Sequence, residues 1–396
     1  MDCCPFPLEV VDIIIHQLHF DLAALKACSL VCRSWLPSCR TQLFRHLELH
    51  PTGRASPANL YRFLSDAPQI APYIKELDVP CERSSWISWD TVLPALLGWL
   101  QNVEQIELRG CDIPWLPAPL TAAIYTLFRS PCMKRVSLRL CVLPSSCSDL
   151  FGSALESIEL SDVTIETDAS AHVAKECRAP RPRRVMIEGK AIGSVVDWLV
   201  PSAEDLQDLC VRYQGDDSDA QQAIERLLQC ASSLKTLDIS LYPACLRECL
   251  RPTLIHHHAT LTIRFPESTS GLCAAPSICY NHDLQQLRLL HFDMDVSSPT
   301  NQLPWLYSLL SRLTTQHLIQ KISIDARHRP RRLCTGPPML DTHGWSDVDA
   351  LLARTAPAHL REVHVQIGDP YDAATLARVA ASMPELRAKG ILRVTM

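Results

Sequence analysis

Glycine, net charge and recognisable catalytic motifs are all scarce in this chain of 396 residues. Its 12 glycines leave little material for a phosphate-binding loop. We find no Walker loop, no G-x-G-x-x-G, no G-x-S-x-G and no H-E-x-x-H. The net charge of −5, with 20 % charged residues, gives no long-range field to attract nucleic acid. The sequence therefore predicts a protein that is not an enzyme and that uses no cofactor or metal.

A leader sequence and long apolar runs are also missing. The amino terminus has no basic region, Asp12 and His16 interrupt its first apolar run, and no stretch has transmembrane length. The 18 cysteines are scattered singly, several at apolar positions of expected helices and strands. That usage is typical of a reduced protein in which cysteine serves as a small core residue. We expect an intracellular protein, cytoplasmic or nuclear, that does not bind membranes.

Three short apolar helical faces are packed into the first fifty residues, "FPLEVVDIIIHQLHFDLAALKACSLVCRSWLPSCRTQLFRHLEL". Pro7 suits the first position of a helix, and Asp21 and Ser29 suit the N-caps of a second and a third. Pro37 predicts a kink or a restart of the third helix. A unit of this size is near the lower limit for a core of its own. Because three short helices cannot cover all of this apolar surface, we expect the excess to face another surface, in this chain or in a partner.

The spacing "PLEV…I…L…L..CSLVCRSW" resembles an F-box, and especially the F-box proteins of mushroom-forming fungi. The resemblance covers roughly residues 5–49, although Phe6 stands where the family usually has leucine. It implies docking on the Skp-family adaptor of a cullin–RING ubiquitin ligase, and therefore a substrate receptor in ubiquitin-dependent protein degradation. Ordinary helical core packing is the alternative explanation of the same pattern. The residues that the resemblance assigns to adaptor binding are Pro7, Leu8, Glu9, Val10, Ile14, Leu18, Leu25, Leu30, Val31, Cys32 and Trp35.

After residue 50, strand-like runs with the pattern apolar-x-x-apolar-x-apolar alternate with helix-like runs. Most anchor positions of these runs fall 22 to 30 residues apart. Strand, helix and strand at that period predict parallel strands joined by helical crossovers. The expected strands are 74–79, 103–108, 133–138, 155–160, 183–188, 206–211, 234–239, 259–265, 284–289, 319–324, 360–365 and 391–396. The expected helices are 91–100, 120–129, 191–199, 220–229, 304–313 and 347–355.

This alternation resembles an irregular leucine-rich repeat. Cys111 and Cys141 fit the repeat's Asn or Cys position, three residues after the third apolar site, but most runs lack it. The predicted fold class is α/β: a three-helix F-box at 5–49, a linker helix at 50–72 and a leucine-rich-repeat-like βα solenoid with a parallel sheet at 73–396. The rival is an open doubly wound sheet, in which the strand order would reverse at a crevice.

In a solenoid, the residues between the apolar sites of each run share one face of the sheet, because strand side chains alternate. Their mixed charge favours a protein target over nucleic acid. Simple solvation is the alternative reading of the same charges. The target-binding candidates are Asp78, Glu107, Arg109, Arg135, Arg139, Glu159, Arg212 and Asp238.

Several other features carry less weight. His256–His258 lie near Cys245 and Cys249, but their spacing matches no familiar zinc site. Two basic runs, 178–184 and 326–332, and a long segment at 327–345 suit exposed loops. Three functions stay open: a ligase substrate receptor, a leucine-rich-repeat scaffold without ligase function, and an α/β-sheet enzyme with no recognised signature. The sequence does not specify the target protein or its pathway.

Overall fold

The chain is described here from a computed structural model. The described residues are 7–81, 86–144, 150–166, 181–189, 192–213, 218–240, 260–264, 288–295, 303, 306–307, 310–311, 319–327, 343–355, 359–368 and 373–395. They fall into two compact units, Met1–Pro182 and Arg183–Met396. Each unit is described by itself.

The first unit begins with three helices, α1 (Leu8–Gln17), α2 (Leu22–Ser29) and α3 (Leu36–Leu43). The predicted cap of the second helix is confirmed, because Asp21 Oδ1 accepts a hydrogen bond of 2.9 Å from the Ala24 amide. The predicted cap of the third is wrong. Ser29 is the last residue of α2, and α3 begins only at Leu36. Pro37 lies in the first turn of α3, where a missing N–H costs nothing, so it starts this helix rather than kinking it.

These three helices form a small core of their own. Val11 and Ile15 of α1, Leu25 of α2 and Cys39 of α3 are buried together. Side chains of Leu18, Cys28, Trp35 and Leu43 pack against them. We call residues 7–45 the helical module.

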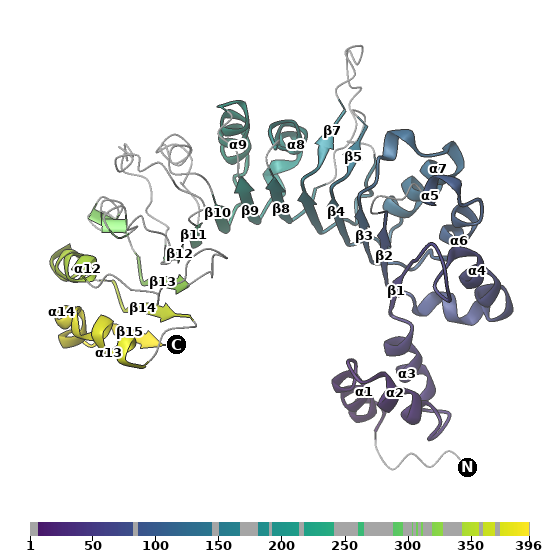
Figure 1. Cartoon of the computed structure of the whole chain (residues 1–396), viewed down its shortest axis with the longest axis horizontal. Coiled ribbons are helices and arrows are strands. Elements are labelled where there is room, and N and C mark those ends of the chain that lie inside the picture. Colours follow the sequence, from purple (N-terminus) through teal and green to yellow (C-terminus); the bar gives the residue numbers. More distant parts are fainter. Residues whose placement is uncertain are drawn as a thin grey trace, which may run out of the picture. The chain divides into compact units, whose positions relative to one another are not determined.

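A parallel sheet follows the helical module within the first unit (Figure 1). Its strand order is the chain order, and each strand pairs with the next in continuous register. The strands are β1 (His46–Glu48), β2 (Glu76–Pro80), β3 (Gln105–Arg109), β4 (Arg135–Arg139) and β6 (Ser157–Ser161). The first of them was missed in the sequence, since three residues are too few to show a period.

Helices of this unit lie against one face of its sheet (Figure 1). The region expected to be a linker helix holds α4 (Pro57–Asp66) and a 3-10 turn, η1 (Pro68–Tyr73). Between later strands come α5 (Trp86–Trp89), α6 (Leu93–Trp99), η2 (Ile113–Trp115) and α7 (Ala118–Phe128). A separate pair of short parallel strands, β5 (Val142–Leu143) and β7 (Thr164–Ile165), follows β4 and β6.

The second unit repeats the same plan. Its strands also pair in chain order and all run parallel. They are β8 (Arg184–Gly189), β9 (Asp208–Tyr213), β10 (Thr236–Ser240), β11 (Thr260–Arg264), β12 (Leu289–Asp295), β13 (Lys321–Arg327), β14 (Glu362–Ile367) and β15 (Leu392–Thr395). The helices among its described residues are α8 (Gly193–Leu199), η4 (Val200–Asp205), α9 (Ser218–Cys230), α12 (His343–Thr355), α13 (Ala373–Ala381) and α14 (Pro384–Ala388).

One predicted strand of the second unit is wrong. The strand expected at 284–289 overlaps the described residues only at 288 and 289, and β12 spans Leu289–Asp295, later than predicted. Both stretches are rich in leucine, but only the second alternates strictly, with Leu290 and Phe292 buried on one side. The remaining expected strands lie within a few residues of their predicted positions. The expected helix at 304–313 is described only in part.

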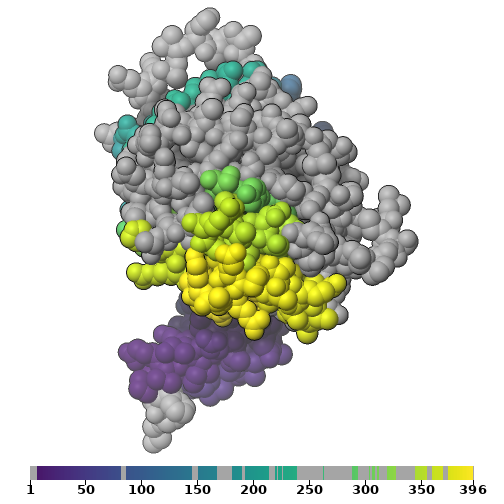
Figure 2. Space-filling view, turned by 90° about the vertical axis from the view of Figure 1, so that its left-hand side faces the viewer, coloured from purple at the N-terminus to yellow at the C-terminus, as the bar shows by residue number. Residues whose placement is uncertain are grey.

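Apolar side chains on alternate strand positions form the cores of both units. Ile106, Leu108, Val136 and Leu138 are examples in the first unit, each with at most 2 % of its surface exposed. In the second unit, the closing elements α13, α14 and β15 form a closely packed layer, coloured yellow in Figure 2. The carboxylate of Asp349 in α12 accepts two hydrogen bonds of 2.9 Å from the Glu385 and Leu386 amides, and so caps α14.

Within each unit the arrangement is that of a leucine-rich-repeat-like βα solenoid, and the fold is α/β as predicted. The strand order does not reverse among the described strands of either unit, so the doubly wound alternative lacks its switch-point crevice. Among the described residues, no helix has the length and apolar character needed to cross a membrane.

Candidate interaction surfaces

The helical module exposes an unusual number of large apolar side chains. Eight of them, all within 24 residues of chain, have between 39 % and 90 % of their surface exposed. Single exposed apolar residues are ordinary, but eight on one small module indicate a contact surface. We call this group the apolar surface of the module. Its members are Leu8, Val10, Ile13, Ile14, Phe20, Leu22, Leu30 and Val31.

The apolar surface follows from the periodicity of α1. Val11 and Ile15 lie four residues apart and share the face that packs on α2 and α3. Val10 and Ile14 are also four residues apart but lie about 100° round the helix, on a second apolar stripe. Three short helices bury only the first stripe. The second is left to solvent in the free chain.

The sequence-predicted adaptor residues divide into two groups. Exposed residues include Pro7 and Glu9, together with five members of the apolar surface, namely Leu8, Val10, Ile14, Leu30 and Val31. By contrast, Leu25 is fully buried in the core of the module, and Leu18, Cys32 and Trp35 are half-buried. Leu25 therefore supports the surface by packing and is not part of it.

Sequence reasoning missed Ile13, Phe20 and Leu22 as surface residues. Ile13 was taken only as part of an apolar run, although its helical position is opposite to the core. Among the described residues, Phe20 is the most exposed large apolar one, and its ring lies 3.7 Å from the ring of His19, centroid to centroid. The signal that could have found these residues is their phase relative to Val11 and Ile15, since they fall outside the single stripe that a small core can use.

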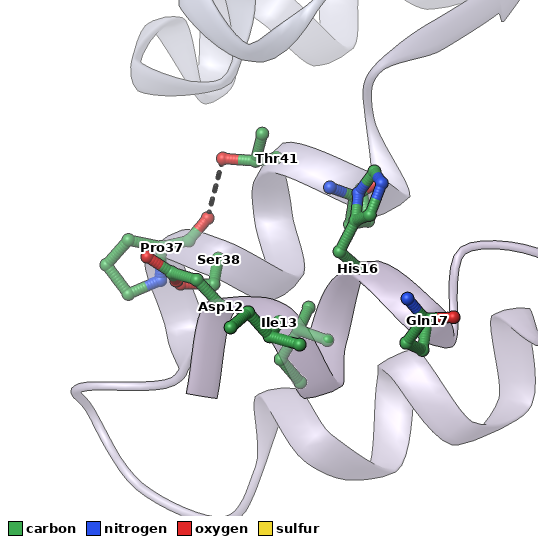
Figure 3. A pocket seen from close by; sticks show the side chains of 9 residues that line it. Asp12, Ile13, His16, Gln17, Pro37, Ser38 and Thr41 are labelled. Carbon is green, nitrogen blue, oxygen red and sulfur yellow. Dashed lines mark hydrogen bonds between the residues drawn. The ribbon is translucent and has the colours of Figure 1, made fainter. Parts of the chain in front are cut away.

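A groove lies between α1 and α3 (Figure 3). Its volume is about 570 Å³, and its lining combines polar side chains, such as Asp12 and His16 of α1 and Ser38 of α3, with the apolar Ile13, Ile15 and Pro37. The Ser38 hydroxyl donates a hydrogen bond to Asp12, and the Thr41 hydroxyl donates one of 3.0 Å to the Pro37 carbonyl. Ile13 links the groove to the apolar surface.

The helix-free face of the sheet in the first unit carries charged side chains in register, and we call it the open face. Arg109 on β3 pairs with Asp78 on β2, and its Nε lies 3.3 Å from Glu107 Oε1. Arg139 on β4 bridges Glu107 at 3.4 Å and Glu159 on β6 at 3.0 Å. The predicted candidates Asp78, Glu107, Arg109, Arg139 and Glu159 are therefore brought together in one ion-pair network.

Electrostatics within this sheet follow from these pairs. The hydrogen bond to Asp78 raises the pKa of the Arg109 guanidinium. At the amino-terminal edge of the strands, Glu104 lies between Lys134 at 2.8 Å and Lys75 at 3.2 Å. The hydrogen bond from Lys134 lowers the pKa of Glu104. Arg135 is exposed and has no ion pair among the described residues.

The other two target candidates lie in the second unit. Arg212 on β9 pairs with Glu188 on β8 at 3.4 Å, and Asp238 lies on β10 opposite Cys210. Further along this sheet, Lys321 on β13 pairs with Glu362 on β14 at 3.0 Å, and two histidines also make polar contacts. His291 Nε2 lies 3.9 Å from the buried Asp325 carboxylate, and His364 Nε2 lies 2.7 Å from the Thr395 hydroxyl.

Three buried cysteines follow successive strands of the first unit, Cys81 after β2, Cys111 after β3 and Cys141 after β4. The Cys141 thiol donates to the Leu108 and Arg139 carbonyls at 3.5 Å and 3.3 Å. Burial raises the pKa of Cys141 to about 12, and a hydrogen bond with Cys81 raises the pKa of Cys111. All cysteines in the described part of the chain are free thiols, so these three serve as core residues.

Several sequence features lie outside the described residues. They are His256–His258 with Cys245 and Cys249, the basic segments 178–180 and 328–332, and most of the segment 327–345. Within the described residues, no group of three histidine, cysteine, aspartate or glutamate side chains is placed to hold a metal ion.

Comparisons with known proteins add little. No family model matches the chain, and no curated protein matches it. Among solved structures it is similar to an internalin (inlF) from Listeria monocytogenes, with 11 % identity over 96 % of each chain and a TM-score of 0.35. It is also similar to an internalin C2 (inlC2) from the same organism, with 15 % identity over 68 % of this chain and 91 % of that chain, and a TM-score of 0.26. The fold assignment rests on the strand order and register described above.

Proposed function

We propose that this protein is an interaction scaffold, in which the apolar surface of the helical module binds one protein and the open face of the sheet binds another. The observation that supports it is the exposure of eight large apolar side chains on a module whose own core is already closed. Each such side chain, when fully buried, contributes about 1.5–3 kcal/mol. A few of them at the centre of an interface are enough to hold a partner.

The scaffold proposal is tested by proximity labelling in cells. A double variant, Leu8→Ser with Ile14→Ser, removes two side chains from the apolar surface. Leu140→Ser removes an apolar side chain that is 62 % exposed elsewhere in the same unit, and serves as the matched control. We expect the double variant to lose a set of labelled neighbours that the control keeps. An identical set of neighbours for all three proteins would contradict the proposal.

A second candidate function is more specific: the partner of the helical module is the Skp-family adaptor, and the protein is a substrate receptor of a cullin–RING ubiquitin ligase. What favours it is the identity of the exposed residues. Five members of the apolar surface, Leu8, Val10, Ile14, Leu30 and Val31, are also positions of the F-box resemblance. In this role the protein has no chemistry of its own and contributes only proximity between target and ligase.

Titration of the full chain with a purified Skp-family adaptor tests this candidate. We expect a complex with the wild-type chain, binding at least about tenfold weaker for the Leu8→Ser/Ile14→Ser variant, and unchanged binding for Leu140→Ser. Trp35→Ala gives a smaller loss, because Trp35 is half-buried in the module. A wild-type chain that does not bind the adaptor excludes the substrate receptor and leaves the scaffold.

A further inference from the structure

The middle positions of the strands in the first unit place a row of acidic residues across the open face. The register pairs Glu48 with Asp78, Asp78 with Glu107, Glu107 with Ser137, and Ser137 with Glu159. Neighbouring strands lie about 4.8 Å apart, so the five positions cover roughly 19 Å. We call these five residues the acidic row.

Negative charge on the open face is only partly neutralised. Arg109 and Arg139 are the cations in contact with the acidic row, against its four carboxylates. Next to the row lie Arg135 and the ion pair formed by Arg45 and Glu76. Together with the acidic row and its two arginines, these residues amount to five carboxylates and four guanidinium groups. Within hydrogen-bond or ion-pair distance, Glu48 has one partner among the described residues, the exposed His50 at 3.8 Å, so the excess lies at the Glu48 end of the row.

Two polar groups in the acidic row lack hydrogen-bond partners in the part of the chain that the structure describes. Ser137 is 8 % exposed, and its hydroxyl has no hydrogen bond. Because Val136 and Leu138 point into the core, Ser137 points into the row between Glu107 and Glu159. Oδ1 of the buried Asp78 is also unpaired. Buried polar atoms are normally satisfied, so a bound group that brings a donor to these two atoms would complete their hydrogen bonding.

The guanidinium groups that pair with the acidic row are partly exposed to solvent. Arg109 and Arg139 have 31 % and 47 % of their side-chain surface exposed. A cation that binds here must compete with these guanidinium groups for the carboxylates of the row. Such an exchange replaces an ion pair within the chain by one with the ligand, and it brings donors to a row in which Asp78 Oδ1 has none among the described residues.

We propose that the acidic row binds a basic peptide segment in the polyproline II conformation, with an arginine or lysine at every third residue. Along the row, Glu48, Glu107 and Glu159 occupy every second strand, so neighbouring members of this set are about 9.6 Å apart. Three residues of polyproline II advance about 9.3 Å, whereas two residues of a β-strand advance only about 6.7 Å. This inference rests on the proposed function, because it names the chemistry of the partner of the open face.

Two fluorescein-labelled peptides of the same composition test the spacing. One is Arg-Pro-Pro-Arg-Pro-Pro-Arg, and the other is Arg-Arg-Arg-Pro-Pro-Pro-Pro. Fluorescence anisotropy with the full chain at low salt measures both affinities. We expect the spaced peptide to bind at least about fivefold more tightly than the clustered one, since only the first places its charges over alternate strands. Equal affinities, or no binding of the spaced peptide, would overturn the proposal.

Paired variants test the location. Glu48→Gln with Glu159→Gln removes two charges from the acidic row, while Glu104→Gln with Glu156→Gln removes two from the amino-terminal edge of the same sheet. We expect about fivefold weaker binding of the spaced peptide in the first variant and a change within about twofold in the second. Equal losses of affinity in both variants would mean that the peptide responds to the overall charge of the chain, and would overturn the proposed site.

Neither assay uses the apolar surface of the module, so failure here leaves docking by the helices untouched. The Leu8→Ser/Ile14→Ser variant should bind the peptide like wild type.

Discussion

The helical module and the repeats that follow it handle apolar residues in opposite ways. In the repeats, strand positions such as Ile106 and Leu138 are fully covered by helices of the same unit. In the helical module, Val11 and Ile15 are covered as well, but a second set of apolar side chains around them is not. Apolar side chains thus form the buried core of the repeats, whereas in the helical module many of them form an exposed surface.

This difference has a geometric cause. A strand shows two faces, and one layer of helices covers the apolar one completely. A helix in a three-helix module contacts its neighbours along one stripe only, so any apolar residue outside that stripe stays in solvent. An apolar residue on the helix-covered face of a strand is therefore evidence about folding, whereas the group on the outer stripes of the module is evidence about binding. Exposed apolar residues of the repeats, such as Trp89, Trp115 and Leu140, lie outside the strands.

The contrast between the two regions requires that the helical module, like the repeats, has a buried core of its own. Leu25→Ala and Leu138→Ala each empty a fully buried site, and each should lower the free energy of unfolding of its own region by about 2–5 kcal/mol. Hydrogen exchange of the α2 and β4 amides measures the two losses. Leu22→Ala, on the half-exposed side of α2, should change the first value by less than about 0.5 kcal/mol. A small effect of Leu25→Ala would mean that the module is held together by something else.

The packing of the closing layer in the second unit should depend on the buried helix cap that Asp349 provides. Asp349→Ala removes the acceptor of both hydrogen bonds at the start of α14, and should destabilise the closing layer of the second unit by about 1–2 kcal/mol. Thermal unfolding followed by circular dichroism measures the loss. Asp347→Ala, an exposed carboxylate in the same helix, is the control and should have almost no effect. Similar behaviour of the two variants would contradict the capping role.

Alkaline titration should sharpen the comparison, because buried thiols follow the strands of the repeats. Burial raises the pKa of Cys141 to about 12, above the ordinary value of about 8.5 expected in the unfolded chain. The folded state then binds the proton more tightly, so this contribution to stability is complete below about pH 8.5 and is lost as the pH rises toward 12. We expect a fall of about 1 kcal/mol per pH unit in that window, and a shallower fall in Cys141→Ala. An unchanged pH dependence in Cys141→Ala would contradict this.

The smallest effect on stability is expected where the effect on binding is expected to be largest. Leu8→Ser with Ile14→Ser should alter the free energy of unfolding by less than about 1 kcal/mol, since both side chains already contact water in the free chain. Urea unfolding of the module checks this. A loss of several kcal/mol would show that these residues belong to a core, and that the apolar surface is a packing surface.

The sequence predicted most strands because the three apolar sites of each run are all used in the same way, as the confirmed strands β3 and β4 show. It failed at β12, where two leucine-rich stretches compete and only the alternation of Leu290 and Phe292 separates them. It also missed β1, whose three residues are placed by their pairing with β2 and not by any local period.

The candidate surfaces were predicted less completely. Asp78, Glu107 and Arg109 were placed on one face from alternation alone, but the pairing that joins them depends on register, which a single run does not reveal. Leu25 was grouped with the surface of the module because a family pattern does not distinguish core from contact residues. Its burial depends on the crossing of α2 with α1 and α3, which only the three-dimensional arrangement gives.

The central claim, that the free chain leaves the apolar surface of its helical module uncovered, is tested most directly by carbene footprinting of the intact protein. The account predicts heavy labelling of Phe20, Leu30 and Val31 and protection of Val11 and Leu25. Protection of Phe20, Leu30 and Val31 to the same level as Leu25 would show that the chain covers this surface itself, and would contradict the claim.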